Sequence, residues 1–120
     1  MKKRSWTKKI KSSCIAAGTY KPCFDPVIDS LALILERRDQ AEDDFKASGG
    51  SSLIEYTNKN GATNQVVNPA LALWDKFNAT ALSYWRDLGL TPLGLKRIDE
   101  KALKNANQDS FTEALSKIFD

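Results

Sequence analysis

Apolar residues between positions 68 and 98 recur at the spacing of helices. Asn68 and Pro69 suit the N-cap and the first turn of a helix, and Gly89 suits the left-handed residue that ends one. Thr91-Pro92 predicts that a second helix begins directly afterwards. Between Asn68 and Gly89 the pattern predicts one wide apolar face. It is formed by Leu71, Trp74, Phe77, Ala81, Tyr84, Trp85 and Leu88.

Another long helix is expected from Val27 to about Ala47, where apolar and charged residues alternate at helical spacing. Asp25-Pro26 predicts its start by the same cap-plus-proline device as Asn68-Pro69. Arg37 and Arg38 lie among acidic residues of this helix. We therefore expect them to pair with those acids in preference to nucleic acid.

Two short β-branched segments, 53–57 and 63–67, flank the turn sequence Asn58-Lys59-Asn60-Gly61. Asn-Gly is a strong hairpin signal, so the sequence predicts a two-stranded β-hairpin at about 53–67. A lone hairpin is marginally stable, and it must pack on the helices or pair with the edge of a neighbouring copy. Its polar tip suits a solvated turn better than a contact with DNA. The fold class is therefore mainly α, with one short hairpin.

Basic residues dominate the first 24 positions, which contain no acidic residue. Such a block is typical of segments that contact phosphate backbones, although a solubilising terminus has the same composition. Trp6, Ile10 and Cys14 fall at four-residue steps, which indicates a helix with one apolar and one basic side. The candidate DNA-binding residues are Lys2, Lys3, Arg4, Lys8, Lys9, Lys11 and Lys21.

The C-terminal segment becomes polar after Ile98 and then carries Ser110-Phe111-Thr112-Glu113, which has the form of a capping box. A short amphipathic helix is expected there. Its apolar residues are candidates for docking on a partner protein: Phe111, Leu115, Ile118 and Phe119. The predicted organisation is a basic N-terminal arm (1–14), a helical core with the hairpin (15–104), and a spacer with the C-terminal helix (105–120).

Several classes of chemistry are disfavoured by the composition. The 120 residues include no histidine and only two cysteines, Cys14 and Cys23, which we expect to be free thiols. Cys/His zinc sites and the commonest general base are therefore excluded. No Gly-rich phosphate loop is present, and the acids of 39–44 suit a solvated helix face. We expect no catalytic residue, no metal and no cofactor. Without a bilayer-length apolar run or a signal segment, the chain is expected to be cytoplasmic.

Three blocks, in this order, resemble the small subunit of phage terminase, in the family typical of long-tailed phages and prophages: GTYKPCFDPVIDSLALILERRDQAEDDF, SGGSSLIEYTNKNGATNQVVNP and YWRDLGLTPLGLKRI. The resemblance covers roughly residues 15 to 100, so 1–14 and the tail after about 104 lie outside it. It implies a non-enzymatic subunit that works in the bacterial host cell and assembles into a homo-oligomeric ring. It also implies binding to double-stranded phage DNA, and recruitment and regulation of the large ATPase and nuclease subunit.

The aromatic face of 69–88 then becomes the candidate interface between copies, through Trp74, Phe77, Tyr84, Trp85 and Leu88. Two alternatives stay open. The segment 81–98 has some features of a helix-turn-helix, which would make the chain a small transcriptional regulator, although Trp85 stands where that motif wants a small residue. The chain could also be a protein-only adaptor in which the basic block has no role.

Overall fold

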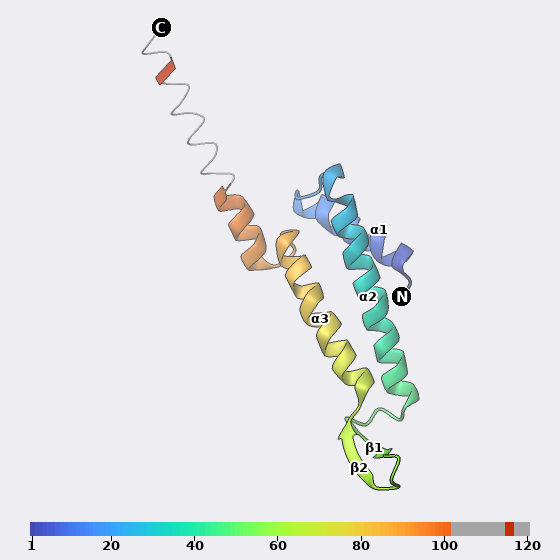
Figure 1. The fold of residues 1–120 in the computed structure, drawn as a ribbon. Coiled ribbons are helices and arrows are strands. Elements are labelled where there is room, and N and C mark those ends of the chain that lie inside the picture. The colour runs from blue at the N-terminus through green and yellow to red at the C-terminus, as the bar shows by residue number, and fades with distance from the viewer. Residues whose placement is uncertain (102–114, 117–120) are drawn as a thin grey trace.

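The computed structural model describes residues 1–101 and 115–116 (Figure 1). Its elements follow the order α1 (Lys3–Ala17), a 3-10 turn η1 (Pro22–Phe24), α2 (Asp25–Ala47), β1 (Leu53–Thr57), β2 (Thr63–Val67) and α3 (Pro69–Asp87). Residues 92–101 are helical again. The mainly helical class and the hairpin at 53–67 are therefore confirmed.

The core lies where the three helices meet. α2 and α3 run side by side in opposite directions, and α1 packs on the N-terminal half of α2 (Figure 1). Burial of their apolar side chains is the main stabilising contribution. The buried cluster consists of Trp6, Ile10 and Cys14 from α1, Ile28, Leu31, Ala32 and Leu35 from α2, and Ala81 and Leu88 from α3 and its end.

α1 is part of this core, and this changes the predicted organisation of the chain. The sequence separated an arm at 1–14 from a core at 15–104, but α1 continues to Ala17 and buries Trp6, Ile10 and Cys14. The predicted helix with one apolar and one basic side therefore forms, and its apolar side packs against α2. The boundary at 14/15 lies inside a helix.

The ends of α3 match the sequence signals. The Asn68 side chain accepts a hydrogen bond from the Ala70 N–H at 3.1 Å, as an N-cap should. Its amide nitrogen donates to Ser48 Oγ at 2.7 Å and to the Ser51 carbonyl at 3.0 Å, and the residue is only 2% exposed. Asn68 therefore joins the end of α2, the hairpin and α3. After α3, Gly89 adopts φ 72°, the left-handed conformation that the sequence predicted.

The start of α2 differs from the prediction. Asp25 is the first helical residue and not the cap, and Phe24 occupies the N-cap position without a side-chain hydrogen bond. The Asp25 carboxylate instead accepts a hydrogen bond from the Tyr20 hydroxyl at 2.9 Å. The short η1 turn that precedes α2 has its own backbone hydrogen bond and continues directly into the helix. A capping side chain is therefore not required.

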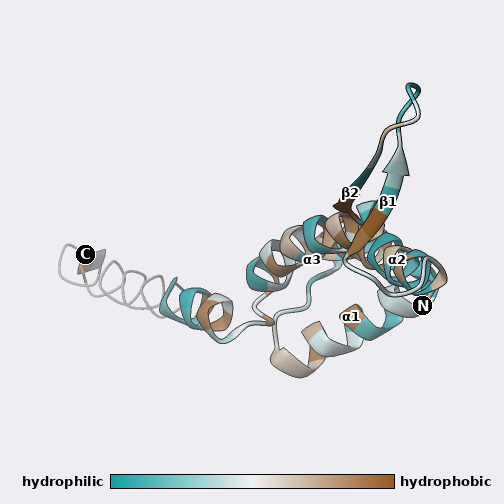
Figure 2. Cartoon of the chain, turned by 90° about the horizontal axis from the view of Figure 1, so that it is seen from below, coloured by the Kyte–Doolittle hydropathy of each residue, from teal (hydrophilic) through white to brown (hydrophobic). Residues whose placement is uncertain are grey.

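The hairpin projects from the end of the α2–α3 pair (Figure 2). Its register places Leu53 opposite Val67 and Thr57 opposite Thr63. The Asn58 side chain closes the turn by accepting from the N–H groups of Asn60 and Ala62. Over the described residues the sheet has these two strands, so both outer edges are open.

The C-terminal predictions fall mostly beyond what the structure describes. Phe111, Ile118 and Phe119 lie outside the described residues. Leu115 is described, since residues 115 and 116 are helical, and it is 38% exposed. Within residues 1–101 and 115–116, no helix combines the length and hydrophobicity needed to cross a bilayer.

Candidate nucleic-acid interface

The outward face of α1 carries three cations in one row. Arg4, Lys8 and Lys11 are exposed and follow the i, i+4, i+7 spacing that places side chains on one side of a helix. The row is about 10 Å long at 1.5 Å per residue. Trp6, Ile10 and Cys14 lie on another side of α1 and pack against α2, whereas the three cations are exposed to solvent. We call Arg4, Lys8 and Lys11 the α1 cationic stripe.

The other predicted DNA-binding residues lie around the stripe. Lys3 is engaged within the fold, because its Nζ lies 3.0 Å from Asp29 Oδ1 on α2. The Nζ of Lys9 lies 5.2 Å from the centroid of the Trp6 ring, and that of Lys11 lies 5.0 Å from the Tyr20 ring. A hydrogen bond with Tyr20 and the nearby charge of Asp25 raise the pKa of Lys11, so this stripe residue also contacts the segment that follows α1. Lys2, just before α1, and Lys21, four residues after it, are exposed.

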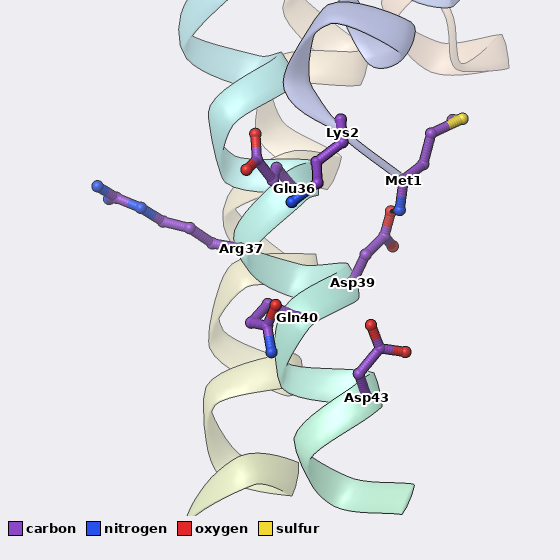
Figure 3. A pocket seen from close by; sticks show the side chains of 7 residues that line it. All are labelled: Met1, Lys2, Glu36, Arg37, Asp39, Gln40 and Asp43. Carbon is purple, nitrogen blue, oxygen red and sulfur yellow. Dashed lines mark hydrogen bonds and ion pairs between the residues drawn. The ribbon is translucent and has the colours of Figure 1, made fainter.

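The start of α1 is fixed to α2 by acidic residues (Figure 3). Asp39 Oδ2 accepts from the Met1 ammonium at 3.0 Å and from the Trp6 indole N–H at 2.7 Å. Glu36 accepts from the backbone N–H of Lys3 at 2.8 Å. Burial alone would raise the pKa of Asp39, but the hydrogen bonds from the Met1 ammonium and the Trp6 indole, together with the charges of Met1 and Arg38, outweigh burial and lower that pKa. The orientation of the stripe is thus set by a short polar network.

Arg38 links all three helices. Its guanidinium carbon lies 5.6 Å from the Trp6 ring of α1 and 5.9 Å from the Trp74 ring of α3. It donates to Asn78 Oδ1 at 3.1 Å and lies 3.5 Å from Asp39 Oδ1. The prediction that this arginine pairs with an acid is confirmed. The same prediction is wrong for neighbouring Arg37, which has no ion pair among the described residues and extends away from α2 (Figure 3).

The five residues predicted to join copies are largely covered within one chain. Leu88 is buried, Tyr84 and Trp85 pack against the core, and Trp74 and Phe77 are half-buried. This face therefore holds α3 on α2. The exposed apolar residues of α3 are Leu73 at 46% and Leu82 at 50%.

A comparison with protein families identifies the chain. The family model described as phage terminase, small subunit, matches residues 3–105. The chain belongs to the phage terminase small-subunit family. No curated protein and no solved structure gives a match.

The family match extends further toward the N-terminus than the sequence resemblance did. The resemblance left residues 1–14 outside, whereas the match begins at residue 3 and so includes nearly all of the α1 helix. α1 with its cationic stripe is therefore part of the terminase small-subunit domain. The match ends at residue 105, before the predicted docking residues Phe111 to Phe119.

Some surface residues were missed by sequence reasoning. The periodicity does not point to Leu73 and Leu82, because they lie at the flanks of the apolar face and the strongest periodicity comes from the residues that pack on α2. A helical wheel would have found them, because each lies roughly a quarter turn from the centre of that face.

Proposed function

We propose that this chain is the DNA-binding, non-catalytic adaptor of a phage packaging terminase. In this proposal it binds double-stranded phage DNA through the α1 cationic stripe and assembles with copies of itself into a ring. It also recruits and regulates the large subunit, which carries the ATPase and nuclease. The observation that carries the proposal is the stripe itself: three outward cations on a helix locked into the core of a terminase small subunit.

The stripe suits the backbone of DNA for two physical reasons. Cations that neutralise phosphates release condensed counterions, which supplies most of the sequence-independent affinity. Because α1 is folded before binding, its backbone is already ordered, so less conformational entropy is lost than with a flexible arm. Three phosphate contacts give modest affinity in one copy. Joining several copies on one duplex raises the apparent affinity through effective concentration.

A salt titration tests DNA binding. Fluorescence anisotropy with a labelled duplex, from 50 to 200 mM NaCl, should give a log–log slope of about −0.9 for each phosphate contacted. Truncation of residues 1–12 is unsuitable, since it would remove Trp6 and Ile10 from the core. Point substitutions in the stripe are the appropriate variants. Absence of binding at 50 mM NaCl would overturn the DNA-binding proposal.

Ring formation needs two different surfaces on each copy if subunits join head to tail. Leu73 and Leu82 are nine residues apart, which is about two and a half turns, so they lie on opposite flanks of α3. We therefore place the contacts between copies at these two leucines. Light scattering should give the mass of several copies for the wild type, and smaller species for Leu73→Ser or Leu82→Ser. Leu93→Ser, exposed to a similar degree outside α3, is the control. A monomeric wild type at micromolar concentration would contradict this placement.

Recruitment of the large subunit is assigned to the C-terminal residues Phe111, Leu115, Ile118 and Phe119. Their apolar spacing suits a helix that binds in a groove, and Leu115 is exposed. The test is ATP hydrolysis by purified large subunit. The small subunit should have no ATPase activity alone but should change that of the large subunit. Leu115→Ser should reduce this effect while leaving DNA affinity unchanged. An unaltered effect would remove Leu115 from the docking surface.

A further inference from the structure

A small groove lies between the last turn of α3 and the helical residues 92–101. It is lined by Arg86 and Asp87 from α3, and by Gly94, Arg97, Ile98 and Lys101 from the second helix. The last four follow an i, i+3, i+4, i+7 spacing, so they share one helix face, which is turned toward α3. The groove holds about 200 Å³. A water molecule occupies about 30 Å³, so a phosphate group fits readily. We call it the α3 groove.

Two glycines bring the walls of the α3 groove together. A Cβ at Gly94 would overlap the backbone carbonyl of Arg86, so only glycine lets the second helix approach this closely. A Cβ at Gly89 would lie 2.8 Å from Cδ1 of Ile98, which lines the groove. The close approach of the helix that carries Arg97 and Lys101 to the backbone of Arg86 is therefore fixed by these two glycines.

The charges of the α3 groove are unbalanced. Among the described residues, three cations line it together with one acid, Asp87. Over residues 1–101 and 115–116, neither Arg86, Arg97 nor Lys101 takes part in a salt bridge, whereas Lys96 on the same helix lies 3.9 Å from Glu100. Like charges that line one groove repel one another, and an external anion relieves that repulsion. The planar guanidinium of arginine can donate two parallel hydrogen bonds to two oxygens of a phosphate, which favours phosphate over a simple halide.

The location of the α3 groove links it to the proposed DNA contact. A Cβ at Gly89 would also lie 2.9 Å from Thr19, so the groove lies beside the C-terminal end of α1, about two turns beyond Lys11 of the stripe. That end lies away from the β-hairpin (Figure 1). We propose that the α3 groove binds a phosphate group of the DNA backbone through Arg86, Arg97 and Lys101. This inference rests on the DNA-binding function proposed above and adds a second contact to it.

Paired substitutions test the α3 groove. The double variant Arg86→Gln/Arg97→Gln removes one cation from each wall of the groove. Lys76→Gln/Lys96→Gln is the matched control, because it removes one exposed cation from each of the same two helices outside the groove. Circular dichroism and melting curves establish that both variants fold. Duplex affinity and its salt slope are then measured for each, alongside the stripe variant Arg4→Gln/Lys8→Gln.

The groove variant should bind duplex DNA about tenfold or more weakly than the wild type at 100 mM NaCl, because charge-assisted hydrogen bonds to phosphate are among the stronger polar interactions. Its log–log salt slope should become shallower by about 0.9 for each phosphate that the variant no longer neutralises. The control pair should stay within about threefold of the wild type, as expected for cations that only contribute to the general field.

The possible failures separate the two proposals. Equal weakening of the groove variant and its control, or no weakening of either, overturns the groove while a weakened stripe variant upholds the proposed function. Absence of wild-type binding overturns both. Inorganic phosphate provides the last arm. If phosphate raises the melting temperature of the wild type and control but not of the groove variant, while all three bind DNA equally, the groove takes free phosphate and the DNA assignment is wrong.

Discussion

Replacing Arg38 tests how the helix carrying the proposed DNA contact is attached. Arg38→Ala removes a guanidinium that lies between the Trp6 and Trp74 rings and donates to Asn78. These partners belong to α1 and α3, while Arg38 belongs to α2. The substitution should therefore loosen all three helices together. Arg37→Ala is the matched control, since Arg37 is the next residue of the same helix and is exposed.

The magnitude follows from the interactions of the guanidinium. Each cation–π interaction contributes about 0.5–1 kcal/mol, and a hydrogen bond to a charged group about 1.5–3 kcal/mol. The side chain is 20% exposed, which weakens these interactions, and its buried Nε has no hydrogen-bond partner within residues 1–101 and 115–116, which offsets part of their contribution. We expect Arg38→Ala to lower the free energy of unfolding by about 2–3 kcal/mol. For a domain near 100 residues this corresponds to a fall of roughly 10–20 °C in Tm.

Urea unfolding at a fixed protein concentration measures the effect, because self-association would make stability depend on concentration. Arg37→Ala should stay within about 0.5 kcal/mol of the wild type, as most exposed substitutions do. Arg38→Lys should recover only part of the stability, since an ammonium lacks the planar fork that stacks on the rings. Equal stability of the Arg37→Ala and Arg38→Ala variants would refute the reasoning.

Three further predictions concern the polar contacts and the thiols. Asn68→Ala should lower the free energy of unfolding by about 2 kcal/mol in urea, because it removes the cap of α3 and both amide donations to Ser48 and Ser51; a change below about 0.5 kcal/mol would contradict this. The lowered pKa of Asp39 means that its carboxylate stabilises the fold fully above the unfolded value of about 3.9, and that this contribution is lost as pH falls through the lower folded value. Asp39→Asn should therefore reduce the difference in unfolding free energy between pH 7 and pH 3, and an unchanged difference would argue against the network. At neutral pH a thiol reagent should modify exposed Cys23 at once and Cys14 only after unfolding, since burial raises the pKa of the Cys14 thiol despite its contact with Thr19; rapid reaction of a Cys23→Ser variant would exclude this.

The parts of the fold that were predictable are those specified by local chemistry. Asn68 and Gly89 mark the two ends of α3 because a cap acceptor and a left-handed residue are requirements of the backbone itself. The hairpin could be predicted for the same reason. The Asn58 side chain accepts the backbone hydrogen bonds of the turn, and Gly61 adopts the positive φ that the turn requires. The predicted start of α2 was wrong because the Asp25 carboxylate can accept a hydrogen bond either as a helix cap or from Tyr20. Only the tertiary structure decides between these two roles.

The candidate site was harder to predict from the sequence than the helix ends and the hairpin, because it depends on tertiary packing. Periodicity identified the apolar face of α3 but not the surface that covers it, so residues such as Leu88 and Trp85 were assigned to contacts between copies although they pack against the chain's own core. The position of Arg38 between two tryptophans joins residues 32 and 36 positions apart in sequence, and no local pattern encodes it. The basic character of the N-terminus was evident from composition, but only the packing of α1 separates its outward cations from those engaged in the fold, such as Lys3.

The most direct test of the central claim compares two variants of equal net charge in duplex DNA binding. Arg4→Gln/Lys8→Gln/Lys11→Gln removes the α1 cationic stripe, and Lys46→Gln/Lys59→Gln/Lys76→Gln removes three exposed lysines from α2, the hairpin tip and α3. The first should make the log–log salt slope shallower by up to about 2.7, at 0.9 for each phosphate that the variant no longer neutralises, whereas the second should leave it nearly unchanged. Equal slopes for the two variants, or a larger change in the second, would contradict the assignment of DNA binding to α1.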